Sequence, residues 1–190
     1  GGGLTEVNML VSLIQSPTTT GEEKARYVDE LNQLALRMVD SLDEIVWAIN
    51  PRNDTVTSLA DYFGLYAQRL MELASVGCGL DVAENLPNQP LAPRFRQELF
   101  LAFKEALINV VQHANATKVW VHISIQDDEM VVIVTDDGCG IIPGKLEAGA
   151  DGLANMRERL EALGGQCDIQ SDQNKGTTVR LQVAIQKARK

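Results

Sequence analysis

The sequence lacks long apolar runs and is poor in cysteine, and each shortage excludes a class of protein. No run approaches the roughly 20 apolar residues that a membrane-spanning helix needs, and no basic segment followed by an apolar core marks a secretion signal. The three cysteines are an odd number and have neither metal-like nor redox-like spacing. We therefore expect a soluble chain in a reducing, cytoplasmic compartment.

Basic side chains are also scarce. Seventeen Lys and Arg against 26 Asp and Glu give a net charge of -9, which would repel a polyanion, so we expect no binding to nucleic acid. Hydrophobic residues make up 45% and charged residues 23%, as in ordinary globular proteins. A length of 190 residues allows one domain with an extra element, or two small domains.

The N-terminal part of the chain is expected to be helical. Thr20 and Glu23 have the spacing of a capping box, which predicts the start of a long helix that Pro51 ends. Seven apolar residues in this helix alternate in steps of three and four, a heptad pattern that favours packing against another helix: Val28, Leu31, Ala35, Met38, Leu42, Ile45 and Ile49. We predict a helical hairpin or a homodimer through residues 28–49, with a helix packed on its own domain as the alternative.

The remaining residues predict an α+β sandwich. Three helices are expected, at residues 56–74, 94–114 and 153–163, and the first should bury one side that includes Leu59, Phe63 and Leu73. Strands are expected at residues 77–84, 118–126, 129–135, 166–172 and 177–185. Asp127 and Asp128 should form a tight turn between two of them. The glycine-rich stretch 136–152 is long for a connection and is a candidate functional loop.

Glu105 and Asn109 form the first candidate site. They are four positions apart on a helix expected to bury Leu107, Val110 and Val111, so the carboxylate and the amide project from one face. Such a pair suits Mg²⁺, which keeps most of its waters and takes only one or two protein oxygens when phosphates supply the rest. The alternative is a solvated polar face of the helix.

The second candidate site is the D-x-G-x-G stretch from Asp136 to Gly140. Asp136 follows a strand directly, where its carboxylate can accept a hydrogen bond from an exocyclic amine such as that of adenine. Gly152 leads into a helix whose free N-terminal amides suit phosphate oxygens. Alone, Asp-Gly is also a common turn.

Taken in order, these segments resemble the Bergerat-fold ATPases over about Ala92 to Ala184. Within that superfamily the chain is most similar to sensor histidine kinases of the nitrate-sensor and desaturase-regulator branch, through Lys104 to Ala114, Asp136 to Gly140 and Gly152 to Leu160. Asp43 to Thr55 also resembles the end of that branch's second dimerisation helix. The resemblance implies a partial dimerisation and histidine-phosphotransfer hairpin over residues 1–55 and an ATP-binding catalytic domain over residues 56–190.

The resemblance also assigns roles to residues. Asn109 would ligate Mg²⁺, and Glu105 corresponds to a carboxylate that activates water in related ATPases. Asp136 would bind the adenine amine. The other residues implied at the nucleotide are His113, Gly138, Gly140, Gly152, Leu153 and Thr177. Two departures from the family pattern are Gln112, where Lys is frequent, and Ala150-Asp151-Gly152 in place of Gly-x-Gly.

The phosphoacceptor histidine is expected outside the sequence. Neither His113, at the nucleotide, nor His122, on a strand without an adjacent acid, suits that role. Gly1 to Thr5 fits the second half of the branch's acceptor pattern, which would place the histidine four positions before Gly1. The parent protein, which is expected to be a kinase attached to the inner membrane, would phosphorylate that histidine from Mg-ATP and pass the phosphoryl group to a response regulator. The alternatives are a nucleotide-binding anti-sigma-type module or degenerate kinase, and a DNA-linked Bergerat ATPase, which the acidic charge disfavours.

Overall fold

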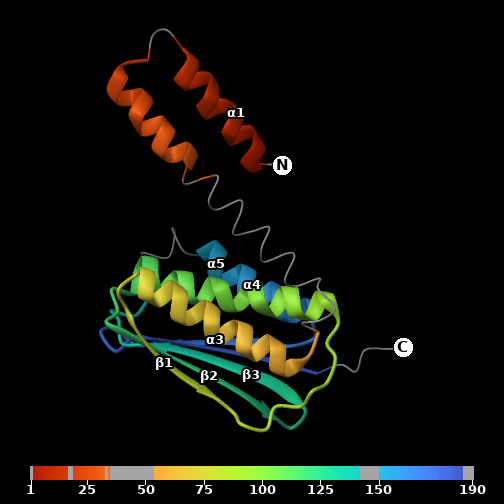
Figure 1. Cartoon of the computed structure of the whole chain (residues 1–190). Coiled ribbons are helices and arrows are strands. Elements are labelled where there is room, and N and C mark those ends of the chain that lie inside the picture. The colour runs from red at the N-terminus through yellow and green to blue at the C-terminus, as the bar shows by residue number, and fades with distance from the viewer. Residues whose placement is uncertain (1, 17–18, 33, 35–53, 142–149, 186–190) are drawn as a thin grey trace. The chain divides into compact units, whose positions relative to one another are not determined.

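The chain forms two compact units, residues 1–49 and residues 50–190. The structure, a computed structural model, describes residues 2–16, 19–32, 34, 54–141 and 150–185 (Figure 1). None of the helices in these ranges is long and apolar enough to cross a membrane.

The first unit contains helix α1, Gly2–Gln15, and a second helix at residues 21–32. The predicted capping box is confirmed, because the Thr20 N–H donates to Glu23 Oε2 at 2.9 Å and the Glu23 N–H donates to Thr20 Oγ1 at 3.3 Å. The heptad pattern beyond residue 34 lies outside the described residues. Self-association through residues 28–49 therefore stays a prediction.

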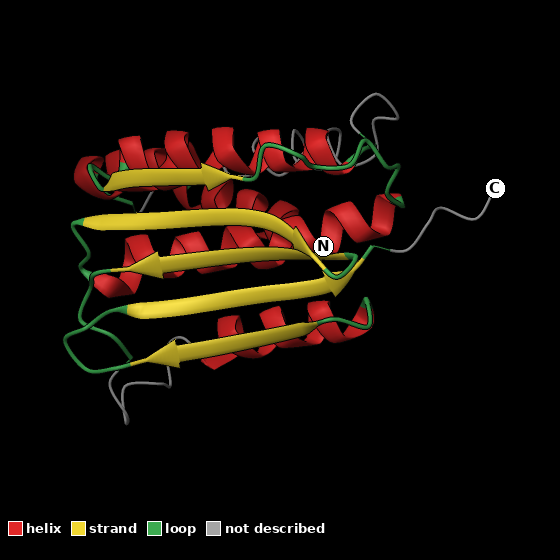
Figure 2. Ribbon diagram, turned by 90° about the horizontal axis from the view of Figure 1, so that it is seen from below, coloured by secondary structure: helices red, strands yellow, loops and turns green. Residues whose placement is uncertain are grey.

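The second unit is a two-layer sandwich, which confirms the predicted α+β fold. Its sheet has five strands in the order β1-β2-β3-β5-β4, and helices cover one face of it while the other face is open (Figure 2). The strands are β1 Gly77–Val82, β2 Lys118–Gln126, β3 Glu129–Asp136, β4 Gln166–Ser171 and β5 Thr177–Ala184. Strand β1 runs parallel to β2, and the other neighbouring strands are antiparallel. The tight turn is confirmed, since Asp127 and Asp128 have φ of 50° and 62°, as a two-residue hairpin turn requires.

Helix α3, Val56–Leu73, packs on helix α4, Pro93–Asn109, through aromatic rings. The rings of Phe63 and Phe103 are stacked, with their centroids 4.4 Å apart. Leu59 and Phe63 are buried as predicted, but the prediction for Leu73 was wrong because its side chain is 77% exposed. Met71 is the buried residue of the last turn, and Leu73 follows it at the end of the helix.

The helix predicted to reach Ala114 ends earlier. Helix α4 stops at Asn109, and Val110–Ala114 form a π-helical turn that Asn115 ends with φ of 49°. A π-type turn is wider than an α-helical one, so the residues after Asn109 leave the expected register. Leu107 and Val110 are buried as predicted, whereas Val111 is 40% exposed. Such turns are frequent at functional sites, and this one adjoins Asn109.

Candidate functional site

Asp136 is a buried carboxylate at the end of β3. Asp136 is only 5% exposed, and its Oδ1 accepts the Gly138 N–H at 2.8 Å. Burial raises the pKa of Asp136, while hydrogen bonds from the backbone N–H groups of Gly138 and Thr177 act in the opposite direction. A carboxylate has about four acceptor positions. After these two bonds, Asp136 can still accept a hydrogen bond from a ligand amine.

Glycines let the backbone close tightly around Asp136. A Cβ at Gly138 would lie 2.2 Å from the Ala114 carbonyl oxygen, and one at Gly176, where φ is 84°, would lie 1.8 Å from the Asp136 carbonyl oxygen. The Cys139 N–H donates to the same Ala114 oxygen at 2.8 Å. The loop that follows Asp136 is therefore attached directly to the end of the π-helical turn, and a side chain at position 138 would separate them.

Ser171 connects three parts of the site, and sequence reasoning missed it. Its Oγ accepts the Ile141 N–H at 2.7 Å and lies 3.0 Å from Thr177 Oγ1 and 3.2 Å from the Gly176 carbonyl oxygen. It therefore holds the segment after Gly140 against the β4–β5 turn and orients the Thr177 hydroxyl. A serine at a strand end is common, and its position shortly before Gly176-Thr177 was the one available signal.

Asp137 was also missed, and its side chain, unlike that of Asp136, is not buried. It is exposed and accepts the N–H groups of Thr117 and Lys118 at 2.8 Å each and the Thr117 hydroxyl at 2.6 Å. These hydrogen bonds lower the pKa of Asp137, and the bond from the Thr117 hydroxyl has the largest effect. Asp137 thus fastens the start of β2 beside the loop that holds Asp136.

We predict that Asp137→Asn removes an acid-dependent part of the stability. Because the pKa of Asp137 is lower in the folded chain than in the unfolded one, its bonds stabilise the fold above the unfolded value of 3.8. That contribution disappears as the pH falls through the folded value. Urea unfolding should show wild type more stable than Asp137→Asn at neutral pH, with the difference shrinking in acid. A difference that stays constant with pH would contradict this role.

Glu105 lies against the start of helix α5, Ala150–Ala162, where α5 packs on α4, and Asn109 follows one turn later on α4. A Cβ at Gly152 would lie 2.2 Å from Glu105 Oε1, so the carboxylate lies against the first turn of α5, just before the half-buried Leu153. The ion pair between Arg159 Nη1 and Glu98 Oε2, 2.5 Å long, also joins the two helices. Helix α5 begins at Ala150, three residues before the predicted start.

Asn109 has an unsatisfied amide. Its Nδ2 is buried and has no hydrogen-bond partner among the described residues. Buried polar groups without partners are rare in folded proteins, and one at a candidate site indicates a missing ligand. Among the same residues, no group of three His, Cys, Asp or Glu side chains could hold a metal ion by itself. A cation here would need most of its ligands from a bound molecule or water.

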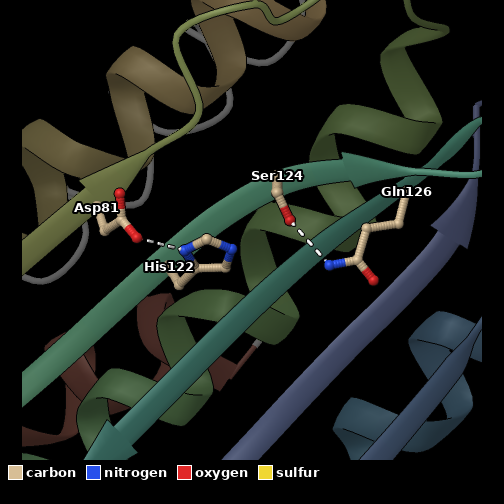
Figure 3. Close-up of polar contacts among 4 residues, drawn as sticks. All are labelled: Asp81, His122, Ser124 and Gln126. Carbon is tan, nitrogen blue, oxygen red and sulfur yellow. Dashed lines mark hydrogen bonds and ion pairs between the residues drawn. The ribbon is translucent and has the colours of Figure 1, made fainter.

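The two histidines lie in different environments. His113 is exposed on the π-helical turn, and its carbonyl oxygen lies 3.5 Å from Cys139 Sγ beside the glycine loop. The prediction that His122 has no adjacent acid was wrong, because Asp81 of β1 is its cross-strand neighbour and its Oδ2 lies 2.8 Å from His122 Nδ1 (Figure 3). The two residues are 41 positions apart in sequence, so only the pairing of β1 with β2 reveals the contact.

His122 belongs to the open face of the sheet. It alternates with the buried residues Val121 and Ile123, whose side chains face the helices. Figure 3 shows Ser124 and Gln126 on the same strand, with Gln126 Nε2 3.4 Å from Ser124 Oγ. Asp136 is paired with Val119 on the helix side, so His122 lies on the opposite face from the candidate site.

The described groups of the site fit a phosphorylated purine. Asp136 offers a buried acceptor for an exocyclic amine, and α5 offers the free N–H groups and positive dipole of a helix start. Asn109 offers an unsatisfied amide one turn after a carboxylate. Residues 142–149, which complete the predicted functional loop, lie outside the described residues.

The known proteins to which this chain is similar belong to one family. The family model described as histidine kinase-, DNA gyrase B- and HSP90-like ATPase matches residues 96–187. The signal transduction histidine-protein kinase/phosphatase UhpB of Salmonella typhimurium is 32% identical over 151 residues, which cover 80% of this chain and 30% of UhpB. Sensor histidine kinase YdfH of Bacillus subtilis is 33% identical over 138 residues, which cover 70% of this chain and 31% of YdfH.

A solved structure has the same fold. The blue-light activated histidine kinase EL346 of Erythrobacter litoralis matches 96% of this chain and 56% of its own, with a TM-score of 0.63 and 20% sequence identity. The chain thus spans less than a third of the length of UhpB and of YdfH, and about half of the length of EL346.

Proposed function

Because the chain belongs to the histidine kinase-, DNA gyrase B- and HSP90-like ATPases and is the ATP-binding catalytic part of a sensor histidine kinase, we propose that it binds Mg-ATP around Asp136 and Asn109. The buried carboxylate of Asp136 is the observation that carries this assignment. The adenine amine would donate a hydrogen bond to the Asp136 carboxylate. A keto-purine would instead place its carbonyl oxygen, which is also an acceptor, against that carboxylate. Thr177, oriented by Ser171, supports the same edge of the base.

The phosphates are proposed to lie between Asn109 and the start of α5. Gly152 and Leu153 are in its first turn, where backbone N–H groups have no partner within the helix. Asn109 fits a Mg²⁺ ligand, since its buried amide lacks a partner among the described residues and turning it would present Oδ1. Bound Mg²⁺ would stabilise the negative charge of the phosphates. His113, exposed on the next turn, is proposed to orient groups near the phosphates.

We further propose phosphoryl transfer to a histidine and then to a response regulator. The γ-phosphoryl group of ATP would move to an imidazole nitrogen, its bond to the β-phosphate oxygen would break, and ADP would leave. Glu105, one turn before Asn109 and against α5, is the proposed acceptor of the imidazole proton. Neither His113 nor His122 is assigned as the phosphoacceptor. A cytoplasmic location, with the parent protein attached to the inner membrane, is part of this proposal.

The test is the Mg²⁺ dependence of nucleotide affinity in Asn109 variants. Asn109→Ala removes the ligand oxygen, and we expect it to weaken ADP binding by about tenfold or more with Mg²⁺ but much less without it. Isothermal titration calorimetry with and without Mg²⁺ measures both affinities. Gln112→Ala, an exposed residue of the adjoining turn, is the matched control and should change neither. Equal losses with and without the metal would assign Asn109 a structural role only.

A further inference from the structure

A groove lies between α3 and β1, on the part of the sheet farthest from β4. It has a volume of about 400 Å³. Its lining residues are Ala60, Asp61, Gly64, Leu65, Gln68, Leu80 and Val82. Leu65 is 67% exposed and Leu80 is 38% exposed, so apolar surface faces solvent at the groove. None of these residues belongs to the candidate nucleotide site.

The free edge of the sheet borders this groove. Strand β1 is terminal in the sheet and pairs with β2 (Figure 2). The Gly77 N–H donates to the carbonyl oxygen of Thr117, just before β2, and the Ala83 N–H donates to that of Ile123 in β2, both at 2.9 Å. Because backbone groups of alternate residues point to opposite edges of a strand, those of Cys78, Leu80 and Val82 point away from β2. Within the part of the chain that the structure describes, these groups have no strand partner and form a free row of donors and acceptors along the groove.

Strand β1 is held firmly from both faces. On the helix side, a Cβ at Gly64 would lie 2.8 Å from Leu80 Cδ2, so α3 approaches the strand closely there. On the open side, a Cβ at Gly79 would lie 2.9 Å from Trp120 Cδ1, so the indole lies on the strand. A strand fixed in this way can pair with an extended segment without rearranging.

The charge around the groove selects the occupant. Asp61 lines it on the helix side, Asp81 is exposed on the open face of β1 beside His122, and Glu84 is exposed just after β1. A second copy of this chain would bring the same acidic groups together in a protein whose net charge is -9. A basic segment would instead be attracted to them.

We propose that the β1 edge and the α3 groove bind an extended segment of a partner protein in which apolar and basic side chains alternate. The segment adds a sixth strand to the sheet through the outward backbone groups of Cys78, Leu80 and Val82. Its apolar side chains face the helices and pack on Leu65 and Leu80, and its basic side chains, which point to the open face, lie beside Asp81. This surface is separate from the nucleotide site and does not depend on its assignment.

The test uses a fluorescein-labelled octapeptide of alternating Val and Lys as the probe. We expect saturable binding to the whole chain, and slower hydrogen exchange at the N–H groups of Leu80 and Val82 when the peptide is present. Leu65→Asp should weaken binding by about tenfold or more, since it replaces an apolar contact with a charge. Leu73→Asp, at an exposed position on the same helix outside the groove, is the matched control and should bind as wild type does. Asp81→Lys, on the open face where the charged side chains of the peptide lie, should reverse the preference toward a Val and Glu peptide.

Three results would overturn the proposal. One is the absence of saturable binding to the wild-type chain. Another is equal binding of the same peptide methylated on every amide nitrogen, because that peptide cannot pair with a strand. The third is sedimentation of wild type as a dimer that Leu65→Asp dissociates, which would make a second copy the occupant. ADP affinity should be unchanged in all three variants, so a failure here is distinguishable from a failure of the nucleotide assignment.

Discussion

Replacing Asp136 by Asn should lower the affinity for ADP roughly ten- to 150-fold, the equivalent of about 1.5 to 3 kcal/mol for a hydrogen bond to a charged group. The substitution keeps the size of the side chain but removes the negative charge that accepts the adenine amine. The site is buried, so water cannot replace the lost acceptor. Isothermal titration calorimetry measures the loss directly.

Asp137→Asn is the matched control for this prediction. It makes the same chemical change one residue further along, at an exposed side chain that bonds to Thr117 and Lys118. Its ADP affinity should stay within a few fold of wild type. Equal binding of ADP and GDP by the wild-type chain, or unchanged ADP affinity in Asp136→Asn, would refute adenine recognition by Asp136.

The same carboxylate should make ADP binding sensitive to acid. Burial raises the pKa of Asp136 above its usual value of 3.8, so the free protein protonates this group at a pH where exposed aspartates are still ionised. Protonation removes an acceptor, and ADP affinity should fall as the pH falls through that raised value. The Asp136→Asn variant should lack this part of the pH dependence.

Gly176→Ala should destabilise the second unit by about 2 to 5 kcal/mol, from backbone strain and overpacking together. Gly176 has φ of 84°, and a Cβ there would lie 1.8 Å from the Asp136 carbonyl oxygen. Neither that oxygen nor the backbone that carries it can move without shifting the end of β3. Urea unfolding should show the lower stability, and ADP affinity should fall with it because Asp136 is displaced.

Gly164→Ala separates the two causes. Gly164 has φ of 73°, but a Cβ there would meet nothing within 4 Å. The free energy of unfolding of this variant should therefore fall only by the strain of a left-handed backbone, about 1 to 2 kcal/mol. Equal destabilisation of the two variants would mean that the contact with Asp136 carries no penalty.

Much of the fold could be predicted from local patterns. Local sequence patterns located every α-helix and strand described in the second unit, and Asp127-Asp128 identified the hairpin turn. The candidate residues Asp136, Gly138 and Asn109 were found because a strand-end acid, paired glycines and a polar helix residue are visible in sequence. Their roles at a nucleotide remain predictions.

Other features of the site could not be predicted. Ser171 binds the Ile141 N–H from 30 positions away, and Asp137 binds Thr117 from 20 positions away. A serine or an aspartate near a strand end has many possible partners, and the strand order decides which one is reached. The π-helical turn after Asn109 was missed because apolar spacing cannot distinguish it from one more α-helical turn.

The sequence by itself determined the elements, the turn between β2 and β3 and the order of the acid and glycine motifs, because period, capping and turn chemistry act between residues a few positions apart. Tertiary structure alone decided that Asp81 pairs with His122 and that the Glu105 carboxylate lies against Gly152. It also decided that β1 is the edge strand of the sheet and has a groove beside it. These contacts join segments far apart in the chain. They form only when the apolar faces of the helices and strands are buried together, which brings distant polar groups within hydrogen-bonding distance.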